Sequence, residues 1–273
     1  MVTVTQTTTK PTQAILKLRA EGRIAESDLP TEAKMAEERL AGAFRIFAEL
    51  NMDEGVAGHI SVRDVVNPHA FWVNPYGVAF DAMTVDDLVL VDHDGRVLEG
   101  GRPGFGQVIN AAGFAIHGSI HRTRPDIHAA AHPHSFYGRA FSSLGRNIDI
   151  TSYDGAKFAH TVKLYDDFGG VVLDDEEGKN ICKALGDEGK GVVLQNHGIL
   201  TVGSTVDAAV AYFIRLEALC RAQLEADAAG GARSLNNPEV SAVFDRAGGE
   251  KEAYRQAQEL YEWIDDITGG DYK

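Results

Sequence analysis

The chain has 273 residues, of which 44% are hydrophobic and 24% charged, and its formal net charge is −14. This length is enough to bury a sizeable core, and the composition is typical of a globular protein. The acidic balance argues against nucleic acid and anionic membranes as partners, because both are bound through a basic face.

Two further features predict a cytoplasmic protein. The two cysteines, Cys182 and Cys220, lie in segments whose pattern is helical, which favours free thiols over a disulfide framework. The opening residues, MVTVTQTTTKPTQ, lack the apolar stretch of a signal peptide, and the chain has no run of eighteen apolar residues.

The first half of the chain begins with a threonine-rich stretch, residues 1–14, which we expect to be disordered. Apolar residues then recur at helical spacing and predict a helix from Glu32 to Leu50. Asp94-Gly95 is typical of a hairpin turn. The short runs typical of strands in this half are 59–63, 71–73, 88–91 and 96–98.

The second half alternates helical and strand patterns. Helices are expected at 108–124, 204–228 and 251–267, and strands at 127–131, 191–195 and 199–202. A capping box at Ser204–Asp207 begins the long helix, and Gly230 ends it. The predicted organisation is a disordered tail at 1–14, an α/β domain at 15–229, and a linker (230–249) with a C-terminal helix at 230–273.

His132 and His134 stand two residues apart at the end of a predicted strand. Strand side chains alternate, so both are expected to point to one side, and Pro133 fixes a backbone torsion between them. Two neutral imidazoles so placed can bind a divalent metal such as zinc, iron, manganese or nickel. His197, between a hydrophobic strand and Gly198, is the third candidate ligand. Polar histidines at a loop mouth and in a turn would give the same pattern.

His117 and His121 form a second pair, four residues apart on one face of a predicted helix. No glutamate lies between them in the manner of His-Glu-x-x-His, so the pair lacks that motif's base. Lining a pocket and facing solvent are the alternatives to metal binding for this pair.

Five segments together resemble the class II aldolase/adducin family: 57–63 (AGHISVR), 74–77 (NPYG), 116–126, 131–135 (AHPHS) and 195–199 (QNHGI). The resemblance runs from about residue 35 to 228. It implies a three-layer α/β/α domain around a mixed, largely antiparallel sheet, often assembled as a tetramer with sites near subunit interfaces. It also implies that His132, His134 and His197 ligate the metal.

Three departures separate the chain from the family's sugar-phosphate aldolases. Their catalytic glutamate corresponds to Gly113 here, and a serine of their second phosphate element corresponds to Tyr76. Their phosphate loop, Gly-Asn-x-Ser, corresponds to Gly58-His59-Ile60-Ser61. A retro-aldol reaction needs a group that moves a proton, which glycine does not have. The sequence therefore argues against a sugar-phosphate aldolase.

The branch that the resemblance implies is that of the bifunctional non-haem iron oxygenases of aminocoumarin (novobiocin and clorobiocin) biosynthesis. These convert a prenylated 4-hydroxyphenylpyruvate, with dioxygen, through a mandelate into a prenylated 4-hydroxybenzoate. The expected cofactor is Fe(II), with Zn(II) or Mn(II) as alternatives. Non-haem iron usually takes two histidines and a carboxylate, which Asp154 could complete. An aromatic 2-oxo acid and dioxygen are the expected partners, in a homo-oligomer.

On this interpretation His117 and His121 are catalytic candidates, and His59, Tyr76 and Tyr153 bind substrate. Other aromatic residues near the motifs, for which core packing is the alternative, are Phe80, Phe105, Phe136 and Tyr137. Two other functions stay open: a redox-neutral metal-dependent lyase (an aromatic-acid decarboxylase or an aldolase with a relocated base), and a non-catalytic adducin-like binding protein. The intact set of histidines favours an enzyme.

Overall fold

A computed structural model describes residues 31–102, 108–170, 175–236 and 238–273. The expected tail at 1–14 and Phe105 lie outside these residues. No helix within them is long and apolar enough to cross a membrane.

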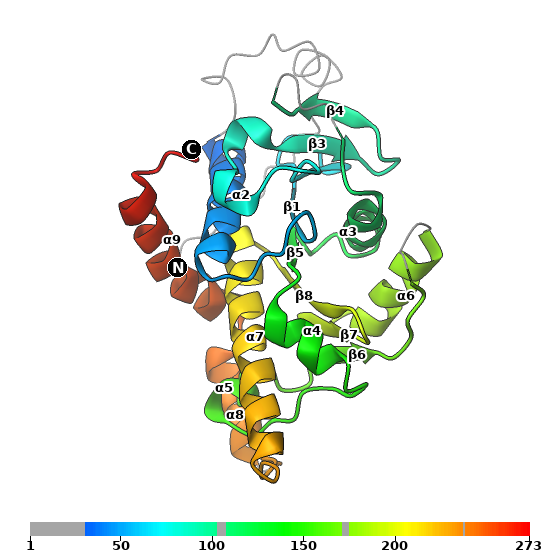
Figure 1. Ribbon diagram of the computed structural model, residues 1–273, viewed down its shortest axis with the longest axis vertical. Coiled ribbons are helices and arrows are strands. Elements are labelled where there is room, and N and C mark those ends of the chain that lie inside the picture. The colour runs from blue at the N-terminus through cyan, green and yellow to red at the C-terminus, as the bar shows by residue number, and fades with distance from the viewer. Residues whose placement is uncertain (1–30, 103–107, 171–174, 237) are drawn as a thin grey trace.

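The centre of the molecule is a mixed sheet (Figure 1) with the strand order β4-β3-β2-β1-β5-β8-β7-β6 in the described residues. Only the β6–β7 pair is parallel there, so the sheet is largely antiparallel, as predicted. The strands are β1 (His59–Arg63), β2 (Ala70–Val73), β3 (Val89–Asp92), β4 (Val97–Gly100), β5 (Ala129–His132), β6 (Val162–Tyr165), β7 (Gly191–Leu194) and β8 (Gly198–Gly203).

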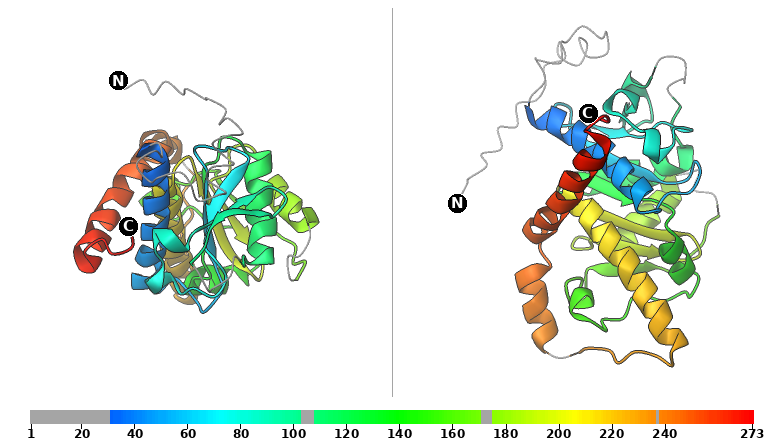
Figure 2. Two further views of the ribbon diagram at one scale, coloured as in Figure 1. Left: turned by 90° about the horizontal axis from the view of Figure 1, so that it is seen from above. Right: turned by 60° about the vertical axis from the view of Figure 1, so that its left-hand side comes forward.

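Helices cover both faces of this sheet, and Figure 2 shows the resulting layers. On one face lie α2 (Thr31–Glu49) and α7 (Val206–Ala228), with α9 (Glu250–Thr268) packed outside them. On the other lie α3 (Ala111–Thr123) and α6 (Asp175–Leu185). The remaining helices are α4 (Phe136–Ser142), α5 (Tyr153–Ala156), α8 (Pro238–Ala247) and the short 3₁₀ helices η2 (Phe80–Ala82) and η3 (Val85–Asp87). The predicted α/β/α class is confirmed.

The alternation of strand side chains divides the apolar interior into two clusters. Ala129 and Ala131 of β5 face the cluster formed with α2, α7 and α9, whereas Ala130 faces the one formed with α3 and α6. The alanine run of β5 is thus buried on both faces, and small side chains let both helical layers approach its end. That end carries His132.

Several predicted boundaries were wrong, for local reasons. The helix expected from residue 108 begins at Ala111, because the Asn110 side chain caps it by accepting from two backbone N–H groups. Thr205, not Ser204, caps α7. The expected linker 230–249 contains α8, which packs beside α5.

Candidate metal centre

Three histidines converge near the neighbouring ends of β5 and β8. Figure 1 shows these two strands side by side in the middle of the sheet. His132 is the last residue of β5, His134 lies between that strand and α4, and His197 occupies the turn between β7 and β8. Their ring centroids are 4.8 Å (His132–His197) and 5.1 Å (His134 to each of the others) apart. One ligand nitrogen from each falls within 4.8 Å of the others. The sequence-predicted ligands therefore form one cluster, although His134 lies beyond the strand.

The donor atoms fit a divalent metal. The Nδ1–H of His132 donates to the backbone oxygen of Ile199 at 2.8 Å, which leaves its Nε2 free as a ligand. This Nε2 lies 3.4 Å from Nε2 of His197. Two imidazole nitrogens at the usual Zn–N distance and a tetrahedral angle are also about 3.4 Å apart. The spacing is that of two ligands on one ion.

Burial keeps this cluster neutral. Burial is the largest cause that lowers the pKa of all three histidines, well below the usual value for His132 and to about 4 for His134. After burial, His197 and His134 also lower the pKa of His132, and His197 and Arg139 lower that of His134. Neutral imidazoles have the free lone pair that a metal requires.

A buried carboxylate holds the segment that carries His134. Glu217 of α7 accepts from Ser135 Oγ at 2.6 Å, from the backbone N–H of Tyr137 at 2.8 Å, and from that of Gly138 at 2.6 Å. These donors belong to the start of α4, so the negative charge also lies at the positive end of that helix. Sequence reasoning missed Glu217, although an acidic residue between the buried Phe213, Leu216 and Cys220 was a signal.

His59 lies beside this cluster, in the space that Gly113 leaves open. In the β1–β5 register His59 pairs with His132, and their ring centroids are 6.1 Å apart. A Cβ atom at Gly113 would lie 2.4 Å from Cδ2 and 2.6 Å from Nε2 of His59. The histidine ring thus fills the volume where any side chain at 113 would begin.

His59 is also an unusual buried polar group. It is 5% exposed, and neither ring nitrogen has a hydrogen-bond partner among the described residues. Burial, followed by the nearby His117 and two of the candidate ligands, lowers its pKa well below the usual value. A neutral buried imidazole with an unused donor and an unused acceptor is available to a ligand.

His117 and His121 are fully buried and share one hydrogen-bond partner. Ser61 Oγ lies 2.6 Å from Nδ1 of His117 and 2.8 Å from Nε2 of His121. The His117 ring centroid is 5.7 Å from that of His59, and His121 stacks on Phe71. Burial lowers the pKa of His117 to about 3. The pair therefore lies in the interior beside His59, and of the alternatives that the sequence left open, a solvent-facing pair is excluded.

The predicted aromatic residues are dispersed. Tyr76 is 49% exposed, after β2, and the neighbouring Asn74 side chain donates to the backbone oxygen of Gly58 beside His59. Tyr153 is 60% exposed and lies against Lys157 of its own segment. Of the others, Phe80 is buried in the core and packs on Phe44, and Phe136 is exposed on α4. The ring of Tyr137 lies beneath the guanidinium of Arg221.

Asp154, the suggested completing carboxylate, is bound elsewhere. It forms an ion pair with Lys157 at 2.8 Å and lies 3.9 Å from Arg215. The group of candidate metal ligands found in the described residues contains histidines alone.

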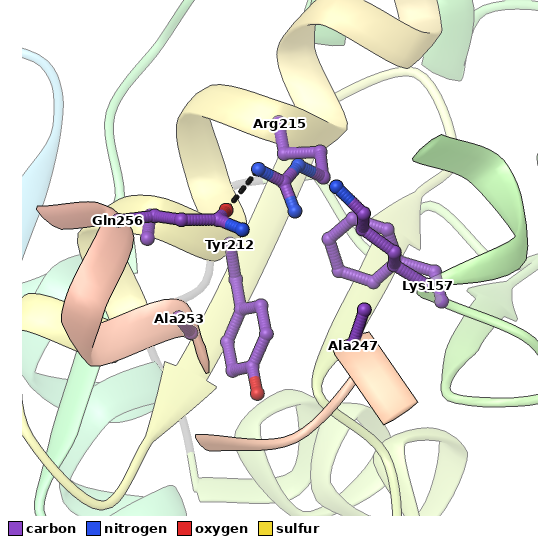
Figure 3. A pocket seen from close by; sticks show the side chains of 8 residues that line it. Lys157, Tyr212, Arg215, Ala247, Ala253 and Gln256 are labelled. Carbon is purple, nitrogen blue, oxygen red and sulfur yellow. Dashed lines mark hydrogen bonds between the residues drawn. The ribbon is translucent and has the colours of Figure 1, made fainter. Parts of the chain in front are cut away.

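A hollow on another part of the molecule holds none of these histidines. Figure 3 shows Tyr212 and Arg215 of α7 facing Gln256 of α9, with Lys157 and Ala247 on the opposite side. Arg215 donates to the Gln256 side chain there. The hollow is lined by residues of α7, α8 and α9 and is separate from the candidate metal centre.

An α/β/α domain that gathers three neutral imidazoles at the end of a central strand has the fold and donor set of a metalloenzyme. Residues 38–224 match the Class II Aldolase and Adducin N-terminal domain. The chain belongs to the class II aldolase and adducin family, as its five motifs predict.

Two curated relatives and one solved structure resemble the chain over most of its length. It is 38% identical over 225 residues to the 4-hydroxy-3-prenylphenylpyruvate oxygenase/4-hydroxy-3-prenylbenzoate synthase of Streptomyces roseochromogenus subsp. oscitans (82% of this chain, 79% of that one). It is 42% identical over 194 residues to the decarboxylase NovR of Streptomyces niveus, and this match covers 70% of each of the two chains. The structure of an L-fuculose 1-phosphate aldolase from Glaciozyma antarctica superimposes with a TM-score of 0.82, at 43% identity, covering 90% of this chain and 97% of that one. These relatives are all named as enzymes.

Proposed function

We propose that the chain is a non-haem Fe(II)-dependent oxygenase that converts a prenylated 4-hydroxyphenylpyruvate, through a mandelate, into a prenylated 4-hydroxybenzoate. The similarity to the Streptomyces prenylphenylpyruvate oxygenase supports the substrate and the reaction. The proposal rests on one observation about the site: the three imidazoles that can hold a metal are kept, while His59 fills the space beside Gly113, the position of the catalytic glutamate in the family's sugar-phosphate aldolases.

Each residue then has a defined part. His132, His134 and His197 would hold the metal, and three neutral ligands would leave its charge uncompensated. When bound, Fe(II) supplies electron-transfer chemistry with dioxygen, whereas Zn(II) or Mn(II) would supply Lewis-acid polarisation. His59 donates a hydrogen bond to an oxygen of the substrate, since its buried ring has no other partner among the described residues.

A positioning role fits the burial of His117 and His121 better than the direct catalytic role that the sequence suggests. Both are buried behind His59 and bound to Ser61, so we propose that they position His59 without touching the substrate. Tyr76 would line the entrance for the aromatic ring, since it is exposed and follows by two residues the Asn74 side chain that donates to Gly58. Tyr153 would meet the substrate only where a second subunit brings it there, in the homo-oligomer that we expect.

A metal-dependent lyase is the second candidate, because a solved structure named as an L-fuculose 1-phosphate aldolase is 43% identical to the chain. The glycine at 113 opposes an aldolase that uses a glutamate there. A lyase that uses His59 as its proton carrier, or a decarboxylase like the one named for NovR, would satisfy the same geometry.

Oxygen consumption separates these functions. Protein purified without oxygen is loaded with Fe(II) or with Zn(II), and 3-prenyl-4-hydroxyphenylpyruvate is added in an oxygen electrode. The proposal predicts uptake with iron alone, and its loss in His132→Ala. Turnover of the same substrate with zinc and no oxygen uptake would establish the lyase.

A further inference from the structure

Arg139 is a cation at the edge of the candidate metal centre. It lies in the last turn of the short helix α4, five residues after His134. A Cβ atom at Gly198 would lie 3.7 Å from Arg139 Cγ and 3.7 Å from His132 Cε1. The side chains of Arg139 and His132 therefore flank the same glycine, the residue that follows His197.

The guanidinium of Arg139 has donors to spare. It forms an ion pair with Glu54 through Nη2, and Nε donates weakly to the backbone oxygen of Ser135 at 3.4 Å. Arginine carries five N–H donors in a planar fork. In the described part of the chain, the contacts of Arg139 leave its second terminal nitrogen open. Its side chain is 38% exposed, so a ligand entering the centre can reach it.

Glu54 is a weak competitor for this cation. Its side chain is 54% exposed, and it belongs to the turn before β1, where it forms an isolated bridge with Ala57. Exposed ion pairs contribute little to stability because water screens both charges, so an incoming carboxylate can displace Glu54 at little cost. Arg139 thus offers a positive side chain beside His132 in a chain whose net charge is −14.

We infer that Arg139 binds the carboxylate of the 2-oxo acid, which replaces Glu54 as the partner of the guanidinium. This inference rests on the proposed function, whose substrate is such an acid. A bidentate arginine–carboxylate pair fixes the plane of the carboxylate, and with it the direction in which the adjoining keto group faces the three histidines. Arg139 would thus select acids over neutral ketones of the same shape.

Binding of an acid and of its neutral analogue tests the inference without turnover. Zinc-loaded protein is titrated under argon, in a calorimeter, with 4-hydroxyphenylpyruvate and with (4-hydroxyphenyl)acetone, which lacks the carboxylate. Arg139→Gln should bind the acid at least tenfold more weakly and the ketone unchanged. Arg139→Lys should fall between, because lysine keeps the charge but not the fork. Glu54→Gln should bind the acid more tightly than the wild type, since it removes the carboxylate that competes for Arg139.

Arg96→Gln is the matched control, because it removes the same charge from an exposed hairpin. Metal content of every variant is measured alongside. Equal weakening of acid and ketone, or loss of zinc from Arg139→Gln, would overturn the inference by assigning Arg139 a structural role. Unchanged acid binding in Arg139→Gln would overturn it and leave the proposed function standing. Failure of the zinc-loaded wild type to bind the acid would instead overturn the proposed substrate class, and this inference with it.

Discussion

Replacement of Glu217 tests whether a carboxylate on α7 holds the metal centre together. Glu217→Ala strands three donors in the interior: the Ser135 hydroxyl and the N–H groups of Tyr137 and Gly138. An unsatisfied buried donor costs about 1–3 kcal/mol. Because water can reach Tyr137 at the half-buried edge, we take the lower value for each and expect a loss of about 3 kcal/mol in the free energy of unfolding.

Glu217→Gln should cost less. An amide oxygen in the place of Oε2 keeps the bonds from Ser135 and Gly138, and only the N–H of Tyr137 then faces an NH₂ group. The expected loss is about 1–2 kcal/mol. Since the segment carries His134, metal affinity should fall by about 10–100-fold in the alanine variant, as for other groups that orient ligands.

Urea unfolding in EDTA measures the first effect, and competition with a chromophoric chelator measures the second. Glu225→Gln is the control, because Glu225 lies on the same helix but pairs with Arg221 at the surface. If Glu217→Ala retained the metal affinity of this control, the carboxylate would be stabilising the fold without orienting the ligands.

Three further predictions concern the buried histidines. Gly113→Ala should lower the free energy of unfolding by about 1–3 kcal/mol, because the new methyl group overpacks against His59, and by markedly less in a His59→Ala background. A double-mutant cycle of urea unfolding measures both losses, and equal losses in the two backgrounds would contradict the contact. Ser61→Ala removes the hydrogen-bond partner shared by a nitrogen of His117 and one of His121, and it should lower the free energy of unfolding by about 2–4 kcal/mol. Little change in urea unfolding would contradict this and indicate that water takes the place of the hydroxyl. The free energy of unfolding of the metal-free protein should fall as the pH drops below about 6.5, because the unfolded chain then binds a proton that the buried His117 does not. His117 alone should contribute a loss of about 1.4 kcal/mol per pH unit down to its folded pKa of about 3. A stability curve that is flat from pH 7 to 5 would contradict the burial of His117.

The sequence predicted the layers of the fold because their signals are local. Helical spacing between 32 and 50 and alternation in the strands depend on neighbouring residues, and α2 and β1 lie where these patterns place them. The α8 helix was missed because glycine, asparagine and proline around it indicate a linker. Its stability comes instead from packing, since Val240 lies in a cluster with Ala156 and Ala159.

The candidate site was predicted in part for the same reason. The His-Pro-His pair and His197 carry local signals, and the structure brings them together. The contact of His59 with Gly113 joins β1 to α3, and the bonds of Glu217 join α7 to α4, so neither follows from spacing along the chain. The sequence did single out both His59 and Gly113, but separately, as two departures from a family pattern. Only the packing of α3 against β1 shows that the two departures are linked, because the His59 ring fills the space beside Gly113.

The account is tested most directly by following oxygen and carbon dioxide in one vessel containing the iron-loaded protein and 3-prenyl-4-hydroxyphenylpyruvate. The oxygenase predicts that carbon dioxide is released only while oxygen is consumed, and that both stop when the vessel is flushed with argon. Continued release of carbon dioxide under argon, at the rate seen in air, would contradict the central claim and identify a redox-neutral lyase.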